Sequence, residues 1–161
     1  MLMHSFMSSV DLVLKDFGEK IRIPDLKLDD DQFCQLVFDK TIIVMIKHDT
    51  KNEKLILFSE VGEIAGNEDH VLALYQEICH ANLLWTDTNY ATLGVEKYSG
   101  SVLLSLALPA ASLTLESLEK ELETFVNTTQ QWKTNIQSTK ESALSSQPEE
   151  LPAEKNIGLR L

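Results

Sequence analysis

Residues 27–60 constrain the fold of this chain more than any other stretch does. They read KLDDDQFCQLVFDKTIIVMIKHDTKNEKLILFSE and hold three apolar runs separated by short polar turns. The middle run is almost continuously apolar and rich in β-branched residues, which is typical of a central strand. The stretch therefore predicts three consecutive strands, at 33–39, 41–47 and 55–58. These strands carry more apolar side chains than one small sheet needs to cover a core.

Helices and a hairpin complete the expected chain. Apolar residues at three- and four-residue steps predict helices at 6–21 and 114–136. A third helix is expected at 67–84, and it begins at an asparagine, a favoured N-cap residue. Alternating apolar and polar residues predict two more strands, at 91–95 and 102–108, joined by a tight turn.

The order helix, three strands, helix, two strands, helix predicts an α+β fold, a twisted antiparallel sheet packed by helices. A length of 161 residues fits one domain, which we place at 1–140. Residues 141–161 shift to serine, proline and glutamate without periodicity, which predicts a flexible acidic tail. The tail includes the apolar run IGLRL, which either docks or frays.

Composition excludes several kinds of partner. The net charge is −11, so phosphates are repelled and neither nucleic acid nor an anionic membrane surface is an expected ligand. No apolar stretch approaches membrane-spanning length, so membrane insertion is not expected. Cys34 and Cys79 each lie in an apolar segment, which predicts two buried free thiols in a reducing, cytoplasmic setting.

No pattern of catalytic or metal-binding residues stands out. The run at 29–31 is acidic, but the mid-loop glycine and terminal glutamate of an EF-hand do not follow it. The four histidines are scattered without the paired spacing of zinc ligands, and no serine lies in a nucleophile-elbow context. The sequence therefore predicts a binding protein, not an enzyme, with no cofactor and no metal.

Three segments carry a family resemblance. They are the opening helix with IRIPDLKLDDDQFCQLVFDK, the strand pair YATLGVEKYSGSVLLSLALP, and the closing LTLESLEKELETFVNTTQQW. Together they resemble the class I chaperones of bacterial type III secretion, the CesT or Tir-chaperone family. The resemblance covers residues 5 to 137. The IPxLxLD run, the LTLE opening of the last helix and the IGLRL run are similar to ExsC-type regulatory chaperones.

The resemblance implies a homodimer that binds the N-terminal segment of a secreted effector in extended form, without ATP. Such a segment can add a strand to a sheet edge while its side chains fill apolar pockets. The side chains expected to line those pockets, any of which can instead belong to the core, are Phe6, Val10, Leu36, Phe38, Ile43, Met45, Leu55 and Leu57. The positions that the family implies for the dimer interface are Leu83, Leu84, Trp85, Leu93 and Val95.

One local feature supports the dimer independently. Leu83, Leu84 and Trp85 are consecutive, so a single helical face cannot bury all three within one subunit. Further partners that the resemblance admits are the secretion ATPase and a regulatory anti-activator.

Three hypotheses remain open from the sequence. The first is a chaperone that keeps an effector soluble and competent for secretion. The second is an ExsC-type anti-anti-activator, which controls secretion genes through a small secreted partner and an anti-activator. The third is an enzyme or small-molecule binder of similar topology, which requires polar groups converging on a closed pocket.

Overall fold

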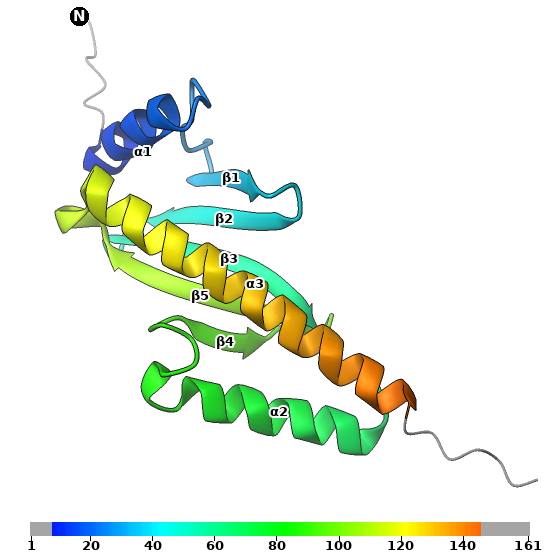
Figure 1. The fold of residues 1–161 in the computed structure, drawn as a ribbon. Coiled ribbons are helices and arrows are strands. Elements are labelled where there is room, and N and C mark those ends of the chain that lie inside the picture. Colours follow the sequence, from blue (N-terminus) through cyan, green and yellow to red (C-terminus); the bar gives the residue numbers. More distant parts are fainter. Residues whose placement is uncertain (1–7, 146–161) are drawn as a thin grey trace, which may run out of the picture.

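The computed structural model describes the backbone of residues 8–145 and the side chains of residues 8–139. The predicted α+β order is confirmed, with two short 3₁₀ turns added (Figure 1). The elements are α1 Ser9–Lys20, β1 Phe33–Phe38, β2 Ile42–Asp49, β3 Lys54–Glu63, α2 Glu68–Asn82, η1 Leu83–Trp85, β4 Thr92–Val95, β5 Ser101–Pro109, η2 Ala110–Ser112 and α3 Leu115–Ser145.

All five strands form one antiparallel sheet in the order β1-β2-β3-β5-β4. Strands β1 and β4 are therefore the two edges. Helix α3 crosses one face of the sheet diagonally, and α1 lies beside the first turns of α3. Helix α2 lies along the β4 edge (Figure 1). A 2.7 Å ion pair between Lys20 and Glu119 joins α1 to α3.

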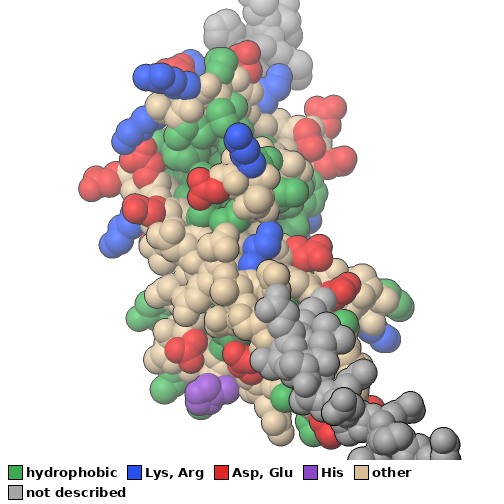
Figure 2. All heavy atoms as spheres, turned by 45° about the vertical axis from the view of Figure 1, so that its right-hand side comes forward, with side chains coloured by type: hydrophobic (Ala, Val, Ile, Leu, Met, Phe, Trp, Pro, Cys, Tyr) green, Lys and Arg blue, Asp and Glu red, His purple; other side chains and the backbone are tan. Residues whose placement is uncertain are grey.

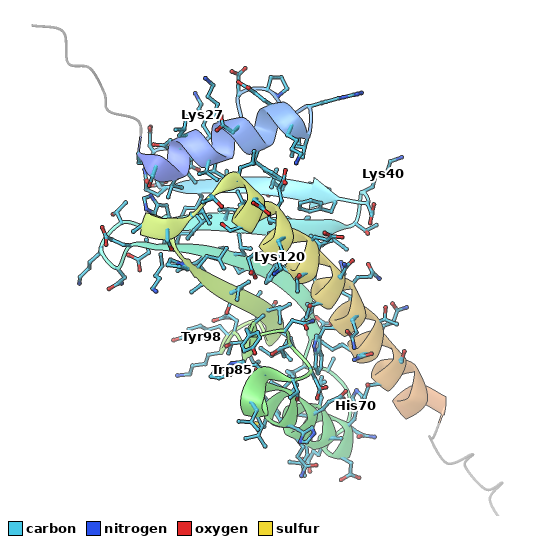
Figure 3. All side chains as sticks on the ribbon, turned by 60° about the vertical axis from the view of Figure 1, so that its left-hand side comes forward. Lys27, Lys40, His70, Trp85, Tyr98 and Lys120 are labelled. Carbon is cyan, nitrogen blue, oxygen red and sulfur yellow. The ribbon has the colours of Figure 1, made fainter. Side chains whose placement is uncertain are left out.

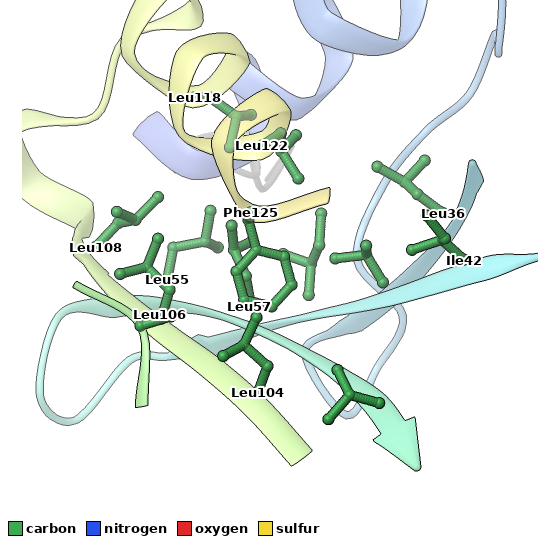
Figure 4. Packing of buried hydrophobic residues seen from close by; sticks show 14 of the residues in the cluster. Leu36, Ile42, Leu55, Leu57, Leu104, Leu106, Leu108, Leu118, Leu122 and Phe125 are labelled. Carbon is green, nitrogen blue, oxygen red and sulfur yellow. The ribbon is translucent and has the colours of Figure 1, made fainter. Parts of the chain in front are cut away.

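The core lies between the sheet and α3. The predicted stripe of the last helix provides its helical side, because Leu118, Leu122, Phe125, Trp132 and Ile136 are all buried. Figure 4 shows three of these side chains above the leucines and isoleucines of the sheet. Burying each large apolar side chain stabilises the fold by about 1.5–3 kcal/mol, so this stripe fixes α3 on the sheet.

Local capping sets where two helices begin. Ser8 and Asp11 form a reciprocal capping box, so α1 starts at Ser9 and not at residue 6. The predicted cap of the second helix is confirmed, since the Asn67 side chain accepts a 2.9 Å hydrogen bond from the His70 N–H.

Three further predicted boundaries were wrong. Strand β3 continues through Gly62 to Glu63, with a register shift at Gly62 where α3 passes so closely that a Cβ would lie 2.7 Å from Ile136 Cγ2. Helix α2 ends at Asn82, two residues early. Helix α3 runs to Ser145, nine residues beyond its expected end at residue 136. The domain boundary after residue 140 stays a prediction, and residues 146–161 lie outside the described residues.

Candidate functional site

One face of the sheet has no helix over it in the described part of the chain. Side chains alternate between the two faces of a strand, and the buried ones face α1 and α3. The opposite side, here called the open face, nevertheless carries large apolar groups. They are Phe33, Val37, Ile43, Met45, Ile56, Phe58 and Leu103.

Strand register joins these groups into a continuous surface. Val37 pairs with Ile43, and Met45 pairs with Phe58. The rings of Phe33 and Phe58 meet edge to face, with centroids 6.4 Å apart, and Lys47 Nζ lies 4.9 Å from the centre of the Phe33 ring. Val37 and Ile43 are 52% and 48% exposed, which leaves apolar area available to a partner.

The two sheet edges differ in their free backbone groups. At β4, the Asn82 side chain acts as a partner strand: its Nδ2 donates to the Leu93 carbonyl and its Oδ1 accepts from the Leu93 N–H, both at 2.9 Å. At β1, Asp29 satisfies Phe33 only: the Asp29 backbone N–H donates to the Phe33 carbonyl at 2.7 Å, and Asp29 Oδ1 accepts from the Phe33 N–H at 2.8 Å.

The rest of the β1 edge is open. Alternate residues of an antiparallel strand direct their N–H and C=O groups to opposite sides, so Gln35 and Val37 point theirs away from β2, as Phe33 does. No hydrogen bond from the described residues satisfies them. An edge of this kind is a template for a further strand.

A groove of about 390 Å³ lies between α1 and the segment that leads to β1. Leu26 and Leu28 form its apolar wall, and Asp11, Lys15 and Glu19 line the helical side. Figure 2 shows apolar side chains gathered at this end of the molecule, ringed by charged ones. The open edge and the α1 groove therefore lie at the same end of the sheet.

The eight side chains expected to bind an effector divide among several environments. Ile43 and Met45 lie on the open face. Val10, Leu36, Leu55 and Leu57 are instead buried in the core, and the half-buried Phe38 packs against it. Phe6 lies outside the described residues.

The correction has a physical reason. Leu55 and Leu57 occupy the strand positions that α3 covers, whereas Ile56 and Phe58 occupy the alternate positions on the open face. Sequence reasoning missed these two residues, together with Phe33, Val37 and Leu103. No signal in the hydrophobicity pattern separates the two sets, because Leu55, Ile56, Leu57 and Phe58 are all apolar.

The residues expected at a dimer interface also divide between exposed and buried positions. Leu83, Leu84 and Trp85 are 63%, 75% and 46% exposed on the turn that follows α2. Leu93 is buried and Val95 is half-buried against the core. Figure 3 places Trp85 far from Lys27, which precedes β1, so this turn and the open β1 edge lie in different parts of the molecule.

The cysteine prediction was partly wrong. Both thiols are free, but Cys79 is exposed on α2 and Cys34 is only half-buried. Burial, with a smaller effect of the nearby Asp29 carboxylate, raises the pKa of Cys34 to about 11. In residues 8–139 no three His, Cys, Asp or Glu side chains are grouped to hold a metal.

We expect the two thiols to react at very different rates. The thiolate is the reactive form, so at pH 8 only about one Cys34 in a thousand is reactive, and its rate rises about tenfold per pH unit up to about pH 11. A disulfide reagent at pH 8 should modify Cys79 quickly and Cys34 slowly. The single variants Cys79→Ser and Cys34→Ser assign the phases, and fast modification of Cys79→Ser would contradict the burial of Cys34.

None of the described helices is both long and apolar enough to cross a membrane. A three-helix, five-strand fold with one open apolar face and one open edge defines a protein-binding module. The sequence model described as the Tir chaperone protein (CesT) family matches residues 13–133. The chain belongs to this family of type III secretion chaperones, which confirms the predicted resemblance.

Individual relatives agree with the family. The chain is 30% identical over 119 residues to the Tir chaperone of Citrobacter freundii, covering 74% of each chain. It is 28% identical over 127 residues to the transcriptional anti-antiactivator ExsC of Pseudomonas aeruginosa, covering 78% of this chain and 83% of that one.

The fold agrees as well. The crystal structure of the ExsC–ExsE complex contains a chain that matches this one with a TM-score of 0.70 and 25% identity. The match covers 81% of this chain and 97% of that one.

Proposed function

We propose that this chaperone binds the N-terminal segment of a secreted protein in extended form and keeps it competent for type III secretion. The observation that carries the proposal is the combination of an open strand edge at Gln35 and Val37 with an apolar sheet face beside it. The proposal places the chaperone in the cytoplasm, where the secreted protein is made.

The open edge and open face provide two kinds of contact. A strand added beside β1 satisfies the exposed backbone groups of β1 and its own, which gives affinity for any sequence. Alternate side chains of the added strand then reach toward Val37 and Ile43 on the open face, and the remaining ones reach toward the α1 groove on the opposite face. Each large side chain buried there contributes about 1.5–3 kcal/mol, which offsets the entropy lost when the segment is ordered.

This mode of binding needs no ATP, because exposed apolar area and unpaired backbone groups exist in the free chaperone. The net charge of −11 favours a basic or mixed-charge segment. We further propose that the chaperone is a homodimer, joined through the apolar turn at Leu83, Leu84 and Trp85.

Affinity purification from the native cytoplasm, followed by mass spectrometry, tests the proposal. We expect one secreted protein to co-purify, with the contact confined to its N-terminal region. A preparation that contains no protein partner, from cells that express the secretion system, would overturn the proposal.

A regulatory role is the second candidate. It is favoured by the similarity to ExsC, a transcriptional anti-antiactivator, at 28% identity over most of both chains. In that case the purified chaperone carries either a small secreted protein or an anti-activator. Deletion of the chaperone gene would then change transcription of the secretion genes, whereas a delivery chaperone would affect only its cargo.

A further inference from the structure

The α1 groove begins beside the point at which residues 1–7 join the described chain. Asp11 and Glu19, in the first and last turns of α1, both line it, and the segment 24–28 forms the opposite wall. Ser8 is three residues before Asp11, and its backbone N–H donates to Asp11 Oδ2 at 3.2 Å. Segment 1–7 is therefore attached at one end of the groove.

The charges along the α1 groove nearly cancel. Three carboxylates and two lysine side chains line it, namely Asp11, Lys15, Glu19, Asp25 and Lys27. The uncharged lining residues are Pro24, Leu26 and Leu28. A strongly charged segment gains little from balanced, solvent-exposed charges, whereas an uncharged segment can bury apolar area against the wall. A suitable occupant is therefore apolar and carries few charges.

Segment 1–7 has this composition. It reads MLMHSFM, so five of its seven residues are apolar and none is aspartate, glutamate, lysine or arginine. Three of them are methionines, whose flexible thioether side chains fill irregular surfaces. The other stretch outside the described residues, 146–161, carries five charged residues. It follows α3, which ends at the opposite end of the molecule from α1 (Figure 1). Segment 1–7 is thus the better match.

The cap of α1 favours entry of this segment into the groove. Ser8 has an extended backbone, with φ −65° and ψ 160°, so the chain before it leaves the helix axis. A capping box is often accompanied by an apolar contact between the residue before the cap and the fourth helical residue, here Met7 and Leu12. Leu12 is about half exposed and shares a helix face with Lys15 and Glu19. A contact at Leu12 would start the segment along the groove.

The segment is also long enough to follow the groove. Glu19 is eight residues after Asp11, which corresponds to about 12 Å along a helix. Seven extended residues span up to about 25 Å. Segment 1–7 can therefore run back along α1 from Ser8 and cover the whole groove within one subunit.

We propose that segment 1–7 occupies the α1 groove of its own subunit in the free chaperone and is displaced by the secreted segment. This inference rests on the proposed function, which places side chains of the secreted segment in the same groove. A short tether gives an effective concentration in the millimolar range. A tethered segment whose own dissociation constant is about 0.1 mM therefore weakens binding of the secreted segment about tenfold.

Nuclear magnetic resonance of the full-length ¹⁵N-labelled chain tests the contact. We expect Phe6→Asp to shift the amide signals of Glu19 and Lys27, because the segment leaves the groove. A synthetic peptide of residues 1–7 with both ends blocked, added to Phe6→Asp protein, should move those signals back. The matched control is Thr50→Asp, which adds the same charge in the exposed β2–β3 turn and should leave both signals in place.

Three results would overturn the occupation of the groove. The first is identical Glu19 and Lys27 signals in wild-type and Phe6→Asp protein. The second is a shift that disappears on dilution, because it would assign the groove to segment 1–7 of a second copy. The third is equal recovery of the signals with a peptide that itself carries Phe6→Asp. Circular dichroism checks the fold, which should be retained because the change precedes the cap at Ser8.

The affinity for the captured secreted protein tests the competition by its sign. If segment 1–7 competes, Phe6→Asp raises that affinity about tenfold. If Phe6 instead contacts the secreted protein, as the sequence first predicted, Phe6→Asp lowers the affinity and the competition is overturned. Shifts at Glu19 and Lys27 without any co-purifying secreted protein would keep the occupied groove and remove the proposed function. A captured secreted protein with unchanged signals would do the reverse.

Discussion

Trp85→Glu is expected to convert the proposed homodimer to a monomer. Trp85 and the adjacent Leu84 are exposed apolar residues on one turn, and truncating a central interface tryptophan typically costs about 2–4 kcal/mol. A buried glutamate adds a desolvation cost, so the dimer dissociation constant should rise by about 30- to 1,000-fold. Light scattering after gel filtration should give the single-chain mass of 18.1 kDa in place of twice that mass.

The matched control for this variant is Leu12→Glu. Leu12 is 51% exposed on α1, far from the turn, so its replacement should leave the dimer mass unchanged. Circular dichroism checks that both variants remain folded. A folded Trp85→Glu protein with an unchanged dimer mass would remove this turn from the interface.

The structure shows that the backbone of this turn is fixed. Leu84 and Trp85 have positive φ values of 59° and 53°, a conformation that costs such residues about 1–3 kcal/mol each. Neighbouring contacts hold the turn in place. Trp132 Nε1 donates to the Asp87 carbonyl at 3.0 Å, and Asn89 Nδ2 donates to Thr128 Oγ1 at 2.8 Å. The exposed side chains are thus presented on a fixed backbone, which lowers the entropy cost of association.

Ile43→Glu is expected to lower capture of the secreted partner by about 30-fold or more. Ile43 lies on the open face beside Val37 of the edge strand, and a charge there must be desolvated when the partner binds, at a cost of about 2 kcal/mol or more. Val37→Thr keeps the β-branched shape while replacing one methyl group with a hydroxyl, so a loss of about fivefold is expected. Both side chains are about half exposed, so the fold should be retained.

Co-purification with the wild-type chaperone and its variants, compared at equal expression, measures this effect. Thr50→Glu is the matched control, because it adds the same charge in the exposed β2–β3 turn. Equal capture by Ile43→Glu and Thr50→Glu would show that the partner binds elsewhere. A loss with Thr50→Glu alone would contradict the role of the open face.

Much of the fold was predictable because it depends on local patterns. The helical stripe from Leu118 to Ile136 and the alternation of β5 each have one apolar face, so their periods determine both the element and its buried side. The Asn67 cap was predictable for the same reason, since a short polar side chain before a helical stripe has one favoured role.

The assignment of residues to the binding face was not predictable in this way. Strands β2 and β3 are apolar on both faces, so Leu57 and Phe58 are equivalent in a pattern of hydrophobicity. The sequence by itself determined that these strands exist and carry surplus apolar surface. Only the tertiary structure decided which face is open, because α3 contacts one side of the sheet and leaves the other to water. The turn after α2 is similar: the crowding of Leu83, Leu84 and Trp85 is local, but their outward direction depends on contacts with α3, distant in sequence.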